Sequence, residues 1–530
     1  MCKETEPKRA IDLSDPRAHD ADHRHWSRRN FLSASGMLTA GSFLFDRSLI
    51  RTFMPSPLLA SLANSETDRV LVLVRLDGGN DSLNMVIERG NDLYYSARPT
   101  IAIPDNNLWA MSPEYGMPLT TSALQPMWDN GMMKAVFNVG YPQPNFSHFR
   151  SYDIIATGSA SDEYLTTGWL GRFLDNQYPA YLEAPPTVPP ALQIGVRSNL
   201  IFRSDVANMA LAVNSPQEFY QIASSGQLYN TSGLGNTAHE LELAFMRQTA
   251  NSAFRYAATV KDAYFKGANT TDYQANNDLA EQMSIVARLI KGNLGTKIYL
   301  VQLGGFDTHA EQADSHPVLM NKLSSAINAF YTDLAEAGMG DKVLTMTFSE
   351  FGRTIYENGS FGTDHGRGTH SLLFGGGLGS GFEGTYQDLS NPNFSVDFRN
   401  LYATILQDWL GSEPDMIRYV MGQPFDPING LVPATTPPIG TNAEEILLGH
   451  HPHQGSTDYI DIKYSLSRAG DIRLDILSTS GEPLRQLTQG YREQGSHIYI
   501  LDKAALFLTP GEYRYRLTTG GRTFERKLLL

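Results

Sequence analysis

The sequence predicts an α/β protein, with a mostly parallel sheet flanked by helices, followed by a small β-sandwich. The first observation is a set of apolar runs typical of strands buried on both faces of a parallel sheet. These runs are residues 70–74, 135–140, 297–303 and 343–348. The second is apolar spacing of three and four residues between or after the runs, which predicts helices. These segments are residues 147–156, 238–266, 273–291, 320–337 and 398–410.

The third observation is that polar and apolar residues alternate with a period of two from residue 457 onward. Glycine-containing turns separate the alternating segments, as expected for antiparallel strands. The pattern predicts a small immunoglobulin-like sandwich.

Length, charge and cysteine use restrict the protein class. The chain has 530 residues, too many for one ordinary hydrophobic core. Its formal net charge of −14 argues against nucleic acid as the main partner, because phosphate binding needs a basic surface. The single cysteine, Cys2, lies in the leader, so the mature fold is expected to have no disulfide and no cysteine-based metal site.

The N-terminus has the features of an export leader. Residues 27–32 read Ser-Arg-Arg-Asn-Phe-Leu, a twin-arginine signature, and the apolar stretch after them is too short for a permanent membrane helix. Small residues predict cleavage after Ala63. The leader predicts the twin-arginine translocase as a partner and a periplasmic, cell-surface or secreted protein. The expected segments are a leader at 1–63, an α/β domain at 64–435, a linker at 436–456 and a β-module at 457–530.

Acidic and histidine side chains follow three of the predicted strands, and two more lie in the glycine-rich loop after the last of them. Loops at the carboxyl ends of parallel strands are where ligands bind. Carboxylates crowded there repel one another unless a cation neutralises them. Carboxylate and imidazole ligands suit zinc, manganese or iron. The expected ligands are Asp77, Asp307, His309, Glu350, Asp364 and His365.

Ser147 opens one of the predicted helices. A serine at this position is usually a helix cap. The same position also suits a nucleophile, because backbone N–H groups and the helix dipole stabilise an anion there. A metal ion beside Ser147 would favour the nucleophile. Arg353 or Arg150 could then clamp the transferred group.

Several short stretches resemble motifs of the domain of unknown function 1501 family. They are Asp-Gly-Gly-Asn-Asp at 77–81, Ser-His-Phe at 147–149, Gly-Trp-Leu-Gly-Arg at 168–172, Gly-Phe-Asp-Thr-His at 305–309, Ser-Glu-Phe-Gly-Arg-Thr at 349–354, Asp-His-Gly at 364–366 and Asp-Phe-Arg at 397–399. With the leader, the resemblance spans roughly residues 27–430.

That family is similar to the alkaline phosphatase and sulfatase superfamily, and the similarity implies two metal ions and a nucleophile at Ser147. The implied residues are Asp77 for one ion, Asp307 and His309 for the second, Glu350 and His365 as further ligands, and Asp364 and His370 close by. Three departures stand out. The spacing of Asp307 and His309 is short, and Phe351 stands where a ligand histidine is expected. The Asp-His-Gly triplet at 364–366 lies in the loop and not at a strand end, so one metal site would be altered or lost.

The resemblance implies an exported metal-dependent hydrolase of phosphate or sulfate esters. The cofactor would be a divalent metal ion, namely zinc, manganese or calcium, and the substrate a small-molecule or polysaccharide ester. The departures leave an alternative, a non-catalytic surface or scaffold protein with a degenerate sulfatase-like core. A third option is an enzyme that acts on sulfated polysaccharide.

Four stretches of the C-terminal module resemble the type IX secretion sorting domain and the flagellar-hook-cap type of β-sandwich. They are residues 480–482, 495–497, 510–514 and 526–530. This resemblance implies the type IX secretion machinery as a further partner and a final position at the outer surface or outside the cell.

Overall fold

The computed structural model describes residues 68–178, 181, 185–195, 199–205, 207–215, 254–412, 414–434, 448–452, 459–466, 469–493, 495–509 and 511–530. The predicted leader at 1–63 lies outside the described residues, as does most of the predicted helix at 238–266. None of the described helices combines the length and apolar character that crossing a bilayer requires.

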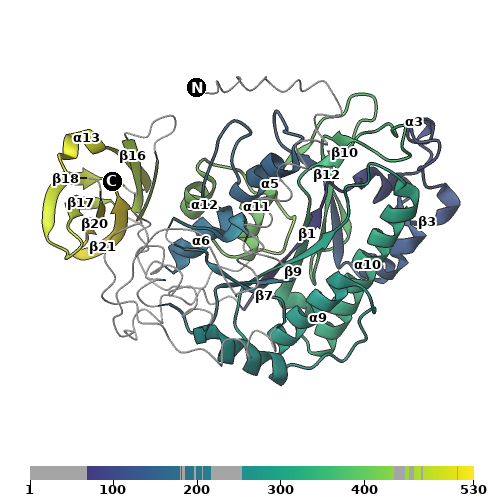
Figure 1. Cartoon of the computed structure of the whole chain (residues 1–530), viewed down its shortest axis with the longest axis horizontal. Helices are drawn as coiled ribbons and strands as arrows, with labels where there is room; N and C mark the ends of the chain where they lie inside the picture. Colours follow the sequence, from purple (N-terminus) through teal and green to yellow (C-terminus); the bar gives the residue numbers. More distant parts are fainter. Residues whose placement is uncertain are drawn as a thin grey trace, which may run out of the picture. The chain divides into compact units, whose positions relative to one another are not determined.

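A nine-stranded sheet forms the centre of the α/β part, in the order β13-β5-β12-β9-β1-β8-β6-β7, with β14 beside β5 (Figure 1). The strands are β1 (Val70–Asp77), β5 (Met133–Gly140), β6 (Ala191–Ile194), β7 (Ala210–Val213), β8 (Ile298–Gly304), β9 (Val343–Phe348), β12 (Thr369–Phe374), β13 (Gly381–Glu383) and β14 (Val396–Asp397). Only the pairings of β12, with β5 and β9, are antiparallel in this sheet. The predicted mostly parallel sheet is therefore confirmed.

Alternate residues of β1 face two different hydrophobic cores. Val72 and Val74 pack into one core, whereas Leu71 and Leu73 pack into the other. Helices α9 and α10 cover the first face, and α5, α6, α11 and α12 cover the second (Figure 1). Their bounds are α5 (His148–Thr157), α6 (Trp169–Gln177), α9 (Asp278–Lys291), α10 (Gln312–Glu336), α11 (Phe398–Thr404) and α12 (Pro414–Met421). Burial on both faces explains why these strands read as continuous apolar runs.

Three helices differ from the sequence prediction at their ends. The helix expected at 273–291 begins at Asp278, because the side chain of Asn277 caps it by accepting from the N–H of Ala280. The helix expected at 320–337 starts eight residues earlier, at Gln312. The helix expected at 398–410 is α-helical only to Thr404 and continues as a π-helix over Ile405–Trp409.

The loop after β1 is anchored by a buried ion pair. Arg98 and Asp81 both have side chains with no exposed surface, and Arg98 Nη1 lies 2.6 Å from Asp81 Oδ2. Next to this pair, His316 Nε2 lies 3.0 Å from Asn80 Oδ1, and burial lowers the pKa of His316 to about 4. Asn80 and Asp81, the last two residues of the Asp-Gly-Gly-Asn-Asp stretch, thus fix the loop through their contacts with His316 and Arg98.

Strand β12 returns antiparallel beside β9, so the whole loop at 349–368 lies at the carboxyl edge of the sheet. Within this loop, β10 (Gly352–Arg353) pairs with β11 (His365–Gly366), with Arg353 opposite His365. This short hairpin brings the end of β9 and the Asp-His-Gly triplet to the same place.

Smaller elements complete the α/β part and the C-terminal module. They are β2 (Ile87–Glu88), β3 (Leu108–Ala110) and β4 (Tyr115–Pro118), which form a three-stranded sheet, and the helices α3 (Asp92–Ala97), α4 (Gln125–Asp129) and α13 (Lys503–Leu506).

The C-terminal residues form two antiparallel sheets that share one hydrophobic core. One sheet contains β15 (Leu448–Pro452), β16 (Tyr459–Leu466) and β19 (Gly495–Asp502). The other contains β18 (Pro483–Arg492), β17 (Gly470–Leu477), β20 (Glu512–Thr519) and β21 (Arg522–Leu529). Strand β15 falls inside the linker predicted at 436–456, and the rest of that linker lies outside the described residues. The immunoglobulin-like type of this sandwich and the role of the module in secretion sorting stay predictions.

Candidate metal centre

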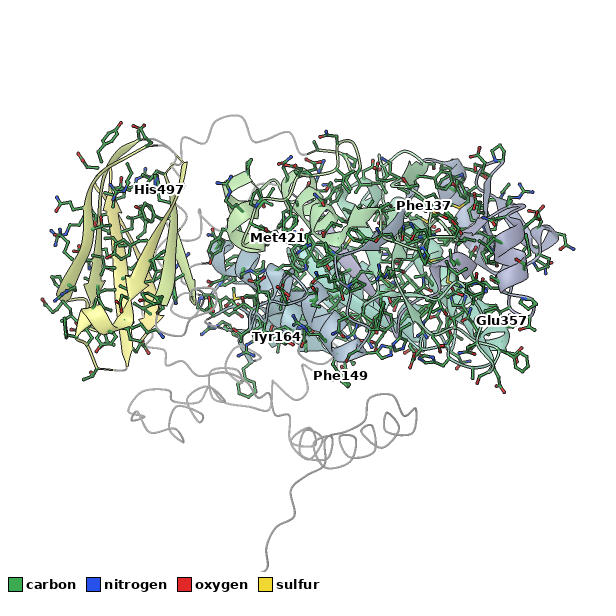
Figure 2. The ribbon with its side chains drawn as sticks, turned by 90° about the horizontal axis from the view of Figure 1, so that it is seen from above. Phe137, Phe149, Tyr164, Glu357, Met421 and His497 are labelled. Atoms are coloured by element: carbon green, nitrogen blue, oxygen red, sulfur yellow. The ribbon has the colours of Figure 1, made fainter. Side chains whose placement is uncertain are left out.

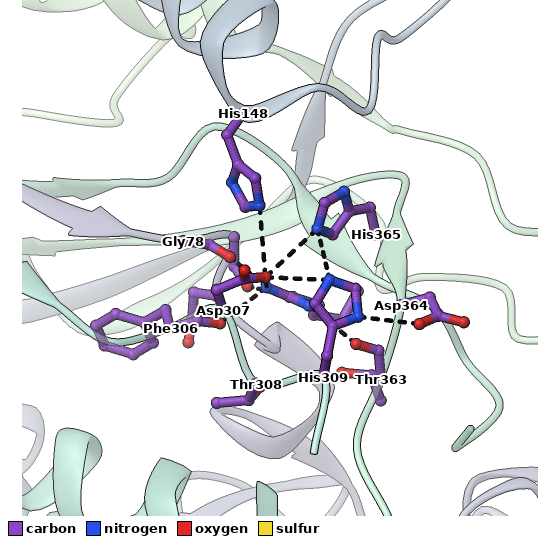
Figure 3. Close-up of polar contacts among 12 residues, drawn as sticks. Gly78, His148, Phe306, Asp307, Thr308, His309, Thr363, Asp364 and His365 are labelled. Carbon is purple, nitrogen blue, oxygen red and sulfur yellow. Dashed lines mark hydrogen bonds and ion pairs between the residues drawn. The ribbon is translucent and has the colours of Figure 1, made fainter. Parts of the chain in front are cut away.

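Three histidine rings converge on one carboxylate oxygen at the carboxyl edge of the central sheet (Figure 3). The oxygen is Asp307 Oδ1, and it lies 3.4 Å from His148 Nε2, 3.2 Å from His309 Nε2 and 3.4 Å from His365 Nε2. Ligand atoms of His148, Asp307 and His365 all lie within 4.8 Å of one another. The four residues come from the start of α5, the loop after β8 and the β11 strand.

The second ring nitrogen of each histidine faces an oxygen acceptor. The pairs are His148 Nδ1 with Glu350 Oε1 at 2.9 Å, His309 Nδ1 with Asp364 Oδ1 at 3.0 Å, and His365 Nδ1 with Phe146 O at 2.7 Å. An ionised carboxylate or a carbonyl can only accept, so each Nδ1 carries a proton. In a neutral ring Nε2 then presents its lone pair to the common centre. Metal-ligating histidines are usually held in this way.

The arrangement is unfavourable without a positive charge at its centre. Nε2 of His309 and Nε2 of His365 are 2.9 Å apart, and two lone pairs at that distance repel. A shared proton or a bound cation removes the conflict. Three imidazole nitrogens with one carboxylate oxygen form a donor set suited to zinc, manganese or iron. Calcium, also expected from the resemblance, does not fit, because it prefers oxygen ligands throughout.

The ionisable groups shift one another's pKa strongly. Burial alone would raise the pKa of Asp307, but hydrogen bonds from the three histidines and Arg353 hold it well below its usual range. Burial alone would lower the pKa of His148, yet its bonds to Asp307 and Glu350 raise it to about 9. The pKa of His309 is raised mainly by its bond to Asp307. Without a metal ion the centre therefore favours the protonated forms of His148 and His309, and a metal ion can take the place of these protons.

Arg353 holds the loops of the centre together. Its side chain has no exposed surface, and its Nη2 lies 2.7 Å from Asp307 Oδ1. The same Nη2 also donates to the carbonyls of Gly78 and Phe306, while Nε donates to the carbonyl of Gly79 and Nη1 to that of Thr363. The clamp on a substrate group that the sequence suggested is not available to Arg353 in this arrangement, because its side chain has no exposed surface and each of its nitrogens donates within the protein.

Three of the expected metal ligands lie outside the point of convergence. Glu350 and Asp364 contact Nδ1 of His148 and of His309, so they orient ligands instead of facing the centre. Asp77 pairs with Arg75 and accepts from Gln302 Nε2 at 2.9 Å. Burial raises the pKa of Asp77. Of the six expected ligands, the structure brings Asp307, His309 and His365 together.

Ser147 occupies the N-cap of α5, directly before His148, and its side chain makes no capping hydrogen bond. The residue is exposed, and it stands next to His148 in the chain. Arg150, the other suggested clamp, donates to the carbonyls of Ser161 and Glu163. Its guanidinium lies 3.8 Å from the ring centre of Tyr164, which projects from the surface (Figure 2).

Phe351 forms an apolar wall of the centre. Its ring centre lies 4.4 Å from that of His365 and 4.9 Å from that of His148. Gly79 (φ 79°) makes room for this ring, because a Cβ there would collide with it. Phe351 also lines an apolar pocket that reaches Glu350, Phe348 and Tyr402. The position where the resemblance expects a ligand histidine therefore holds no metal-binding group.

Sequence reasoning missed His148 as a ligand. The available signal was its position one residue after Ser147, at a helix start that follows a strand end. His370, expected close to the site, is instead a core residue. It is buried, its Nδ1 accepts from the N–H of Asn138, and burial lowers its pKa to about 3.

The orienting role of Asp364 leads to a testable expectation. In Asp364→Ala, His309 loses the acceptor that fixes its ring, so metal affinity should fall by about 10- to 100-fold. Because Asp364 is exposed, the free energy of unfolding should change little. Titration against a chromophoric chelator measures the affinity, and Asp129→Ala, an exposed aspartate on α4, is the matched control. Equal affinity in both variants would contradict this role.

Comparison with solved structures finds members of the alkaline phosphatase and sulfatase group. The sulfatase PsFucS1 from Pseudoalteromonas sp. matches with 11% identity and a TM-score of 0.29, over 87% of this chain and 92% of that chain. An alkaline phosphatase superfamily protein from Vibrio parahaemolyticus matches with 10% identity and a TM-score of 0.30, over 86% of this chain and 89% of that chain. Alkaline phosphatase from the Antarctic bacterium TAB5 matches with 8% identity and a TM-score of 0.26, over 59% of this chain and 95% of that chain. Likenesses this distant transfer neither fold nor activity to this chain.

No curated protein matches the sequence. Residues 127–428 match the family described as "Protein of unknown function (DUF1501)". The matched range contains His148, Asp307, His309 and His365, together with the side chains that orient them. It covers more than half of the chain, and the chain therefore belongs to the DUF1501 family.

Proposed function

We propose that the protein is a metal-dependent hydrolase of phosphate or sulfate esters. The metal ion would be held by Nε2 of His148, His309 and His365 and by the carboxylate of Asp307. The observation that carries the proposal is the convergence of three Nε2 atoms on Asp307 Oδ1, with every Nδ1 engaged by an acceptor.

The surroundings favour one metal ion per chain over two. Asp77, expected to bind a second ion, is already neutralised by Arg75. Phe351 places an apolar ring against His148 and His365, where a further ligand would be needed. The remaining carboxylates, Glu350 and Asp364, are occupied in orienting histidines.

Ser147 is the proposed nucleophile, with a water molecule as the alternative. Its hydroxyl is free of the capping bond and stands at the N-terminus of α5, where N–H groups and the helix dipole stabilise negative charge. In this scheme the oxygen of Ser147 forms a bond to phosphorus or sulfur while the bond from that atom to the ester oxygen breaks, and the alcohol leaves with the proton of Ser147. Water then attacks the phosphorus or sulfur, which releases phosphate or sulfate and returns a proton to Ser147. A bound divalent ion would supply Lewis acidity, offsetting the negative charge of the transferred group.

The experiment is metal analysis joined to an ester panel. Protein exported in folded form should contain about one zinc, manganese or iron ion per chain, and it should hydrolyse aryl phosphates or aryl sulfates. Removing the ion with a chelator should stop hydrolysis, and adding it back should restore the rate. Protein that never binds a divalent ion would rule the proposal out.

A second candidate function is a non-catalytic surface or scaffold protein. It is favoured by Phe351, which closes one side of the centre, and by the engagement of Arg353 in the loops. Full metal content without turnover on any phosphate or sulfate ester would support this alternative.

Export and surface attachment are proposals that rest on sequence alone. The twin-arginine stretch at 27–32 motivates export through the twin-arginine translocase, and residues 510–514 and 526–530 motivate sorting by type IX machinery. A substrate outside the cytoplasm, such as a sulfated polysaccharide, would match this route.

A further inference from the structure

We propose that Arg75 binds the oxyanion of the substrate, namely the non-bridging oxygens of a phosphate or sulfate group held at the metal centre. The inference deepens the function proposed above and rests on it. It assigns Asp77 a different role from the expected one, since Asp77 would hold Arg75 in position instead of binding metal.

Arg75 has hydrogen-bonding capacity that the described part of the chain does not use. Its Nη2 pairs with Asp77, which in turn is oriented by Gln302. Its Nε is buried and has no hydrogen-bond partner among the described residues. A buried N–H group without an acceptor is costly, so Nε of Arg75 is a donor that an acceptor from outside the chain would satisfy. The side chain is 16% exposed, which leaves a path for a ligand.

The position of Arg75 places these donors beside the centre. Arg75 lies at the carboxyl end of β1, and its guanidinium is 3.7 Å from the ring centre of Tyr152. Tyr152 follows His148 by four residues on α5, so the two side chains share one helix face about 6 Å apart along the axis. The positive charge of Arg75 also helps to lower the pKa of Glu350, the residue that orients His148.

The other two arginines considered for this role are unsuitable. Arg353 donates to four carbonyls and to Asp307. Arg150 follows His148 by only two residues, which turns it about 200° around the helix, away from the face of His148. There it donates to carbonyls at 161 and 163.

The chemistry of a guanidinium defines the ligand class. Its planar set of N–H donors matches two oxygens of a tetrahedral anion and remains charged at any physiological pH. A lysine in the same place would supply charge but no such fork. A phosphate or sulfate ester has non-bridging oxygens for this fork and one more oxygen for a metal ion.

The test measures binding of inorganic phosphate and, separately, inorganic sulfate to the full-length chain loaded with metal. Calorimetry compares the unmodified protein with Arg75→Gln and Arg75→Lys. Arg89→Gln is the matched control, because Arg89 is a surface residue paired with Asp105. Arg75→Gln should weaken binding of the preferred anion about tenfold or more. The affinity of Arg75→Lys should lie between that of Arg75→Gln and that of the unmodified protein. Arg89→Gln should bind the anion as tightly as the unmodified protein does. Which anion binds more tightly distinguishes a phosphate site from a sulfate site.

Several results would overturn the assignment. They are unchanged anion affinity in folded Arg75→Gln, no measurable binding of either anion by the unmodified protein, and equal weakening in Arg89→Gln. Circular dichroism and metal content show whether Arg75→Gln is folded. If it is not, Arg75→Lys decides, and unchanged affinity there overturns the proposal.

The failure of the proposed function gives a different signature. Anion binding that depends on Arg75, without turnover of any ester, refutes the hydrolase and supports the oxyanion site. Turnover whose KM and phosphate inhibition are the same in Arg75→Gln supports the hydrolase and refutes the role of Arg75.

Discussion

Replacing Asp307 by alanine is expected to abolish metal binding and, with it, hydrolysis. Asp307 Oδ1 is the atom on which three histidine nitrogens converge, so its removal deletes a ligand and the charge that holds the rings together. Loss of a single side chain that only orients a metal ligand weakens affinity by about 10- to 100-fold, so loss of the ligand itself should exceed that range. Metal content after gel filtration and the rate of ester hydrolysis measure the effect.

Asp314 provides the matched control for this experiment. It is an exposed aspartate in the first turn of α10, seven residues after Asp307. Asp314→Ala should keep the metal and the activity of the unmodified protein. An Asp307→Ala variant that retains a stoichiometric metal ion would show that Asp307 is not an essential ligand and would contradict this prediction.

The second large effect is expected for Arg353→Met, on the stability of the fold. Arg353 is fully buried, and its guanidinium ties the loops after β1, β8 and β9 to one another. Methionine fills most of the volume but leaves buried carbonyls and the carboxylate of Asp307 without their donor. The free energy of unfolding should fall by about 3 kcal/mol or more, because each buried carbonyl left without its donor costs about 1–3 kcal/mol. Urea denaturation measures this value.

The same experiment separates two roles for Arg353. A clamp on the substrate would change KM and leave the free energy of unfolding nearly intact, whereas a tie between loops changes stability first. Arg367→Met, an exposed arginine in the same loop, should alter the free energy of unfolding by less than about 0.5 kcal/mol. A stable Arg353→Met protein with a raised KM would contradict the structural role.

Much of the α/β architecture could be predicted from local sequence. The strand expected at 343–348 coincides with β9, and the run at 70–74 is the first part of β1. Burial on both faces leaves only apolar residues acceptable in such strands, which makes them conspicuous. The antiparallel direction of β12 was not predictable in this way, because an apolar run does not record which way it crosses a sheet.

The candidate site was predicted less completely. The position at the carboxyl edge followed from the acidic residues after each strand, and Asp307, His309 and His365 do meet there. His148 was overlooked because it stands one residue inside a helix, where the sequence pattern pointed to Ser147. Asp77 and Glu350 stand at strand ends as expected, but they do not face the centre. Asp77 pairs with Arg75, and Glu350 contacts His148.

The sequence by itself determined which segments are buried, where the acidic residues gather and which family the motifs resemble. These properties depend on residue type and spacing, and both can be read along the chain. Only the tertiary structure decided which carboxylates face the centre and which orient a ring. That distinction depends on the direction of individual atoms, which is set by the pairing of β10 with β11 and by the placement of α5 over the end of β1.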